Sequence, residues 1–129
     1  MNGRCLLDTN IVIALFASDS AILDRLKDAE EVFIPSIVMG ELYYGARKSS
    51  RVEENIARLD DFSANNIILS CDSGTAHWYG EVKGGLREKG RPIPENDIWV
   101  AAIALQHDLT LVTRDVHSAE VEGLKTETW

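Results

Sequence analysis

Short apolar runs that suit β-strands alternate with segments of helical periodicity along most of the chain. This alternation restricts the fold, because strands joined by helices pair in parallel through right-handed crossovers. It predicts an α/β fold in which a central, mostly parallel sheet carries helices on both faces. We expect strands at residues 5–7, 32–34, 67–69, 111–112 and 124–126, and helices at 10–17, 20–27, 35–46, 52–62, 72–88 and 97–106.

Local sequence signals refine several helices. Ser36 is expected to act as the N-cap of one helix, and Asp72 or Ser73 as the N-cap of another. Gly84 and Gly85 interrupt the second of these helices and predict a kink or a close backbone approach, because glycine destabilises a helix interior.

The size and composition fit one ordinary globular domain, which we expect to span residues 1–129. A chain of this length buries roughly two-thirds of its unfolded surface, which is enough for a core. The expected helix at 97–106 is apolar almost all round, and this pattern indicates burial in the middle of the domain.

The sequence carries no sign of export. The longest apolar stretch near the N-terminus, residues 11–17, is far too short to span a bilayer, and no signal-peptide pattern is present. Two cysteines, Cys5 and Cys71, are too few for a disulfide framework, and Cys5 lies in an apolar strand as a reduced core residue. These features predict a cytoplasmic protein.

The net charge of −8 argues, taken alone, against nucleic-acid binding, because phosphate contacts need lysine and arginine. The distribution of charge matters more than its sum if several acids bind a metal. Basic residues cluster in two places, at 47–51 and at 83–91. A charged run of this kind is usually a solvated surface.

Two acids directly follow expected strands. Asp8 comes after the first strand, and Asp115 comes shortly after the fourth, in the sequence "LVTRD". In parallel α/β sheets, ligands bind beyond the carboxyl ends of the strands, so both acids lie where a site is expected. Each is equally compatible with a role as a turn or cap residue.

Two further acids lie on expected helices. Glu41 is placed on or beside the apolar stripe of its helix, where an unpaired carboxylate would cost several kcal/mol. It needs a cation or a proton there, and an intramolecular pair with lysine or arginine is the simpler alternative. Asp97 opens the apolar helix at 97–106, where it either favours the helix dipole or is aimed into a site.

Together the four acids predict a metal site. Two unit charges ~5 Å apart repel by about 3 kcal/mol at an effective dielectric constant of about 20, so gathered carboxylates need a counter-charge. Oxygen ligands favour Mg²⁺ or Mn²⁺. The histidines have no paired spacing for a zinc site, and the chain has neither a Gly-rich phosphate loop nor a serine nucleophile elbow.

At this point the sequence resembles the PIN-domain family, and within it the VapC-type ribonuclease toxins of prokaryotic toxin–antitoxin pairs. Four motifs in order carry the resemblance, which covers nearly the whole chain. They are Asp8-Thr9-Asn10 after a strand, Ser36 followed by "ELYYG" with Glu41, "NDIWVAAIA" with Asp97, and "LVTRD" with Asp115. One departure is Ala119, where relatives often carry phenylalanine.

The resemblance implies a PIN fold and metal-dependent cleavage of RNA. Asp8, Glu41, Asp97 and Asp115 would hold one or two Mg²⁺ or Mn²⁺ ions, with Thr9 and Thr113 orienting carboxylates or water. Two divalent ions would offset half of the net charge. The resemblance further implies a homodimer and a small antitoxin that occludes the acidic groove. The residues that we expect to contact the RNA backbone are Lys83, Arg87, Lys89 and Arg91.

Three alternatives remain at this stage. A phosphate-receiving receiver domain needs an acidic pair after the first strand and a lysine after the fifth, and the chain lacks both. A non-catalytic PIN-like binding module predicts a damaged acidic set, whereas all four positions are intact. A PIN ribonuclease that processes cellular RNA without being a toxin is compatible with every residue named above.

Overall fold

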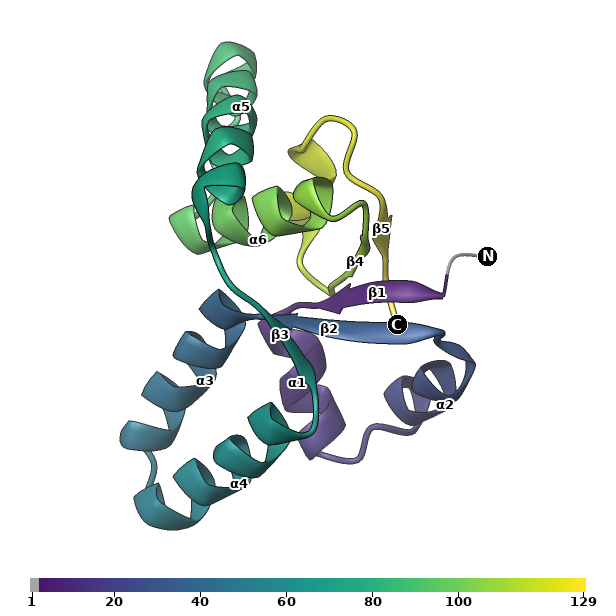
Figure 1. Cartoon of the computed structure of the whole chain (residues 1–129), viewed down its shortest axis with the longest axis vertical. Coiled ribbons are helices and arrows are strands. Elements are labelled where there is room, and N and C mark those ends of the chain that lie inside the picture. Colours follow the sequence, from purple (N-terminus) through teal and green to yellow (C-terminus); the bar gives the residue numbers. More distant parts are fainter. Residues whose placement is uncertain (1–2) are drawn as a thin grey trace.

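The computed structural model describes residues 3–129 and contains one five-stranded sheet (Figure 1). Every neighbouring pair of strands is parallel, and the order is β3-β2-β1-β4-β5. This arrangement confirms the predicted α/β fold with a parallel sheet. The strands are β1 (Arg4–Leu7), β2 (Glu31–Pro35), β3 (Ile67–Leu69), β4 (Thr110–Val112) and β5 (Thr126–Glu127).

Helices cover both faces of the sheet, with α1 to α4 on one side and α5 and α6 on the other (Figure 1). They are α1 (Thr9–Phe16), α2 (Ser20–Asp28), α3 (Ser36–Arg47), α4 (Val52–Ala64), α5 (Ser73–Lys89) and α6 (Glu95–Gln106), followed by the 3₁₀ helix η1 (Val116–Glu120). Within residues 3–129, no helix has the length and apolar character needed to cross a membrane.

The direction of the chain across the sheet explains these two layers. From β1 through β2 to β3, each new strand is added toward one edge of the sheet. The chain then crosses back over β2 and β1 and adds β4 on the other side of β1. Right-handed crossovers that run in opposite directions place their helices on opposite faces. The reversal between β1 and β4 is a topological switch point, where a crevice opens beyond the carboxyl ends of the strands.

Helix α6 is buried on nearly all sides, as its sequence predicted. Ile103 and Ala104 belong to the main core, which is formed largely by residues of the strands and of α1 to α4. Ile98 and Ala101 instead pack in a second cluster with residues of α5. Because α6 contributes to both clusters, apolar residues are needed all round it. Its deep burial fixes the position of its first turn relative to the sheet.

Several local expectations were wrong. Ser36 is not an N-cap but the first residue of α3; Pro35 precedes it as the last residue of β2, so the strand leads directly into the helix. α5 continues unbroken through Gly84 and Gly85, where an added Cβ would meet no atom within 4 Å, so there is no close approach. α6 begins at Glu95, and Asp97 is therefore its third residue.

The remaining local features agree with the sequence analysis or extend it. Asp72 is the N-cap of α5, as one of two expected candidates. Cys5 is a buried free thiol in β1, and Cys71 is a free thiol at the surface. The last strand lies at Thr126–Glu127, so it begins two residues later than expected.

Candidate active site

Asp8 lies at the junction of β1 and α1, and only 7% of it is exposed. One carboxylate oxygen accepts a hydrogen bond from the backbone N–H of Thr9 (2.8 Å), which makes Asp8 the N-cap of α1. The other accepts one from the Thr113 hydroxyl (2.7 Å). Asp8 is thus a cap residue, as one of its two expected roles, and it lies at the carboxyl end of β1 beside the switch point.

Thr113 connects the ends of β1 and β4. The register pairs Leu7 with Val112, so Asp8 and Thr113 follow neighbouring strand ends. The buried Thr113 hydroxyl donates to Asp8 and accepts from the backbone N–H of Asp115 (2.9 Å). This single hydroxyl fixes one acid directly and the turn that carries a second.

Asn10 completes this connection and was not singled out by the sequence analysis. Its side-chain nitrogen lies 3.4 Å from the Thr113 hydroxyl, and its side-chain oxygen accepts from the backbone N–H of Arg114 (3.1 Å). The start of α1 is thereby tied to the turn after β4. Its place in the motif Asp8-Thr9-Asn10 was the available signal.

Glu41 lies on α3 with its carboxylate held by the Thr9 hydroxyl, which donates over 2.6 Å. The expectation of a costly position on the apolar stripe was wrong, because Glu41 is exposed. The buried face of α3 consists of Val38, Met39, Leu42 and Ala46. Glu41 instead lines an open groove of about 370 Å³ that also contacts Asn96, next to Asp97.

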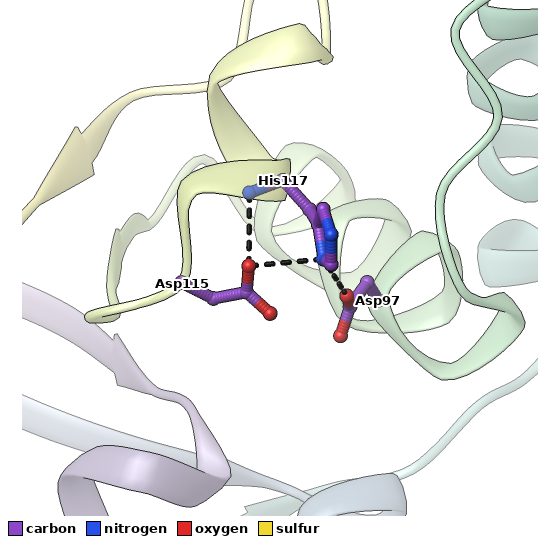
Figure 2. Close-up of side chains that lie close together, drawn as sticks. All are labelled: Asp97, Asp115 and His117. Carbon is purple, nitrogen blue, oxygen red and sulfur yellow. Dashed lines mark hydrogen bonds and ion pairs between the residues drawn. The ribbon is translucent and has the colours of Figure 1, made fainter.

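Asp97 and Asp115 face one another across the imidazole of His117 (Figure 2). The Nδ1 atom of His117 lies 3.3 Å from an Asp97 oxygen and 2.9 Å from an Asp115 oxygen. The backbone N–H of His117 also donates to Asp115 (2.9 Å), because Asp115 is the N-cap of η1. The sequence analysis missed His117; its position two residues after Asp115 was the only local signal.

Burial and like charges act against ionisation of two of these acids. Burial is the main cause that raises the pKa of Asp8, and the nearby Glu41 and Asp115 raise it further, against the opposing hydrogen bonds from Thr113 and Thr9. Burial also raises the pKa of Asp97, followed by the charges of Asp115 and Asp8, while His117 lowers it. The acids therefore act on one another through their charges, but among residues 3–129 the group of three or more possible ligand atoms within 4.8 Å consists of Asp97, Asp115 and His117, without Asp8 or Glu41.

The donor set fits a divalent cation. Among residues 3–129, no lysine or arginine forms an ion pair with Asp8, Glu41, Asp97 or Asp115, so the expected alternative of an intramolecular pair for Glu41 does not hold. Carboxylate oxygens gathered without such a partner favour hard divalent ions. A bound cation would relieve the repulsion that raises the pKa of Asp8 and Asp97.

The four basic residues expected to contact RNA differ in their interactions: the two lysines have partners within the protein, and the two arginines form no ion pair with residues 3–129. Lys83 forms an ion pair with Glu95 (2.9 Å), and Lys89 donates to the backbone carbonyl of Glu120. Arg87 is exposed and, like the exposed Arg91, forms no ion pair with any residue from 3 to 129. The carboxyl-terminal half of α5 points away from the strands (Figure 1). Lys83 and Arg87 nevertheless line one pocket with Glu95 and Ile98, the residues on either side of Asn96 and Asp97 in α6.

Comparison with known proteins identifies the family. Residues 5–124 match the model of the PIN domain. The chain is 40% identical over 129 residues to the ribonuclease VapC2 of Haemophilus influenzae, covering 98% of both proteins. It is 33% identical to the tRNA(fMet)-specific endonuclease VapC of Shigella flexneri, again over 98% of both. The crystal structure of VapBC2 from Rickettsia felis, bound to a promoter DNA fragment, superposes with a TM-score of 0.89 at 31% identity, covering 97% of this chain and 98% of that one. The chain therefore belongs to the PIN-domain family, and within it to the VapC proteins.

Proposed function

We propose that this protein is a metal-dependent endoribonuclease toxin of the VapC type, formed by a single PIN domain over residues 1–129. The observation that carries the proposal is the raised pKa of Asp8, to which Glu41 and Asp115 contribute, and of Asp97, to which Asp115 and Asp8 contribute. Family membership excludes the receiver-domain alternative. The intact acidic set argues against a non-catalytic binding module.

The four acids would hold one or two divalent cations, Mg²⁺ or Mn²⁺. A cation there would supply Lewis acidity, which makes a water molecule more acidic and offsets negative charge on the phosphate. The remaining contribution comes from the residues of the chain, which must hold the carboxylates still and aim them into the crevice.

Two threonine hydroxyls perform that positioning in the proposal. Thr113 donates to Asp8 and leaves the other lone pairs of the carboxylate available for a cation, while Thr9 does the same for Glu41. Fixed carboxylates lower the reorganisation needed when the RNA phosphate arrives. In-line attack by water would leave a 5′-phosphate and a 3′-hydroxyl, so the ribose 2′-hydroxyl is not needed as the nucleophile.

The proposal includes three partners. Cytoplasmic RNA is the substrate, and the unpaired Arg87 and Arg91 are the first choice for its backbone contacts, ahead of Lys83 and Lys89. A second copy of the chain forms a homodimer. A small VapB-like antitoxin inhibits the enzyme by occupying the groove beside Glu41, where an arginine side chain suits the clustered acids.

Cleavage of RNA by the purified protein tests the proposal. We would incubate it with total RNA from the source organism, including initiator tRNA, with Mg²⁺ or EDTA, and map new 5′ ends. Asp8→Asn and Asp97→Asn serve as site variants. The expected result is discrete cuts with 5′-phosphates that disappear with EDTA and in both variants.

Two other outcomes would change the conclusion. If the folded, metal-loaded protein cuts no RNA, the proposal is wrong and the binding module replaces it. If it cuts RNA but no antitoxin gene accompanies its own and expression leaves growth unaffected, the enzyme is an RNA-processing PIN nuclease. Charge reversal at Arg87 and Arg91 separately tests the RNA contact, because it should weaken binding and flatten the salt dependence.

A further inference from the structure

The side chain of His117 adds a nitrogen atom to a site otherwise built from oxygen. Asp97, Asp115 and His117 each offer one ligand atom, and these three atoms lie within 4.8 Å of one another. Ligand atoms bound to one cation at about 2.0–2.3 Å are separated by no more than about 4.6 Å. The three atoms therefore need little movement to surround a single ion.

An ion pair alone does not account well for this arrangement. The Nδ1 atom of His117 carries at most one hydrogen, yet it faces an oxygen of Asp97 and an oxygen of Asp115 at once (Figure 2). It therefore points at the place where the two carboxylates converge. A cation at that place would satisfy all three atoms together.

The backbone holds His117 in position independently of its ring. Its N–H donates to the Asp115 carboxylate, and Asp115 is in turn fixed by the Thr113 hydroxyl through its own N–H. The ring is therefore presented to Asp97 by a turn that is already tied to the site. A substitution of the ring leaves these backbone contacts intact.

We propose that Nδ1 of His117 is a ligand of the divalent cation held by Asp97 and Asp115, and that it makes the site prefer a transition-metal ion over Mg²⁺. The inference rests on the proposed function, since it concerns the same site. Mg²⁺ prefers oxygen ligands and retains its waters, whereas imidazole nitrogen suits first-row transition metals. Replacing one oxygen ligand by nitrogen therefore weakens Mg²⁺ relative to first-row transition-metal ions, among which Mn²⁺ binds nitrogen most weakly.

Mn²⁺ is a suitable probe, because it is paramagnetic and reports its own ligands. We would load the full-length protein with Mn²⁺ without RNA and record the electron spin echo, in which a bound imidazole gives ¹⁴N modulation. Mn²⁺ affinity is measured by titration and Mg²⁺ affinity by competition. His117→Gln removes the ring, and His77→Gln on the exposed surface of α5 is the matched control.

The expected result has two parts. The wild-type protein and His77→Gln show ¹⁴N modulation, and His117→Gln loses it. His117→Gln also weakens Mn²⁺ binding by about 10–100-fold while Mg²⁺ binding changes by less than about threefold. Bound Mn²⁺ without ¹⁴N modulation in the wild-type protein overturns the inference, and this measurement needs no variant to fold. Equal weakening of both ions overturns the metal preference.

Failure of the inference and failure of the proposed function are distinguishable. RNA cleavage by the wild-type protein together with nitrogen-free Mn²⁺ binding would reject His117 as a ligand and leave the nuclease in place. Nitrogen-bound Mn²⁺ without cleavage of any RNA would support the inference and reject the nuclease.

Discussion

Asp8 and Asp72 occupy the same local position and behave in opposite ways. Each is the N-cap of a helix and accepts a hydrogen bond from a backbone N–H of its first turn. Asp72 is exposed, and its pKa is lowered, chiefly by the hydrogen bond from Gln106 and then by Thr75. Asp8 is buried, and its pKa is raised.

The difference lies in what surrounds each carboxylate. Asp72 accepts from the Gln106 amide (2.8 Å) and from the Thr75 backbone (3.0 Å), and no acid acts against it. Asp8 also accepts two hydrogen bonds, but burial and the neighbouring acids outweigh them. A cap whose charge is stabilised serves the fold, whereas a cap whose charge is unfavourable is suited to bind a cation.

The largest expected effect is on catalysis. Asp8→Asn should lower the RNA cleavage rate by at least about 10³-fold, because a metal ligand contributes several kcal/mol to stabilising charge in the transition state. Asp72→Asn should leave the rate within about twofold, since Asp72 lies outside the site. Single-turnover cleavage of one mapped RNA at saturating Mg²⁺ measures both. Because asparagine also caps helices, equal losses in the two variants would mean that the effect is not specific to the charge of Asp8 at the site.

Each of the two capping carboxylates accepts a hydrogen bond from a threonine, Asp8 from Thr113 and Asp72 from Thr75. Substitution of these threonines should change the cleavage rate less than Asp8→Asn does. Thr113→Val removes the hydroxyl that orients Asp8, and we expect cleavage to fall about 10–100-fold, as for other groups that orient metal ligands. Thr113→Ser should restore most of the rate, because it keeps the hydroxyl. The same cleavage assay measures each variant.

The matched change at the other cap is Thr75→Val, which should lower the thermal unfolding temperature but not the cleavage rate. Thr75 is fully buried, and its hydroxyl donates to Gln106. A rate loss in Thr75→Val as large as that in Thr113→Val would show that general destabilisation, not orientation of Asp8, explains the effect.

Removal of the structural cap itself should act on stability. Asp72→Ala deletes the capping box and leaves Gln106 without its carboxylate partner, so we expect the unfolding temperature to fall by roughly 2–6 °C. The lowered pKa of Asp72 means that its contribution is present at neutral pH and is lost as the pH falls through the folded-state pKa. Calorimetry at neutral and acidic pH measures both effects; a deficit that persists unchanged in acid would contradict this account.

The comparison also marks what the sequence could predict. The strand–helix alternation predicted the parallel sheet, and the all-apolar pattern predicted the burial of α6. Three of the four acids were singled out because they follow or open recognisable elements, and Glu41 because of its expected position on or beside an apolar stripe; the PIN resemblance then grouped the four. These features depend on local sequence and on the order of elements.

What the sequence could not predict depends on long-range contacts. The contact between Asp8 and Thr113 requires β1 to pair with β4, 105 residues away in sequence. His117 lies beside Asp97 because η1 folds the turn after β4 back toward α6. On α3, helical spacing did not distinguish the exposed position of Glu41 from the buried stripe next to it. The N-cap pattern likewise does not separate Asp8 from Asp72, because the partners of each carboxylate lie far along the chain.

The smallest expected effect has the opposite sign from the others. Since the pKa of Asp97 is raised in the folded protein, its ionisation costs stability, and this cost grows as the pH rises through the folded-state pKa. In EDTA at neutral pH, Asp97→Asn should therefore raise the unfolding temperature slightly. The gain should vanish below a pH of about 4, where the carboxyl group is protonated in both states.

A divalent cation should reverse the order of the two proteins. Mg²⁺ or Mn²⁺ at about 100 times its dissociation constant stabilises a protein that binds it by about 2.7 kcal/mol, so the wild-type protein would overtake Asp97→Asn. Asp72→Asn, in contrast, should be less stable than the wild-type protein with EDTA and gain as much from the cation. If Asp97→Asn is the less stable protein in EDTA at every pH, then Asp97 is a structural acid like Asp72, and the distinction between the two kinds of acid does not extend beyond Asp8.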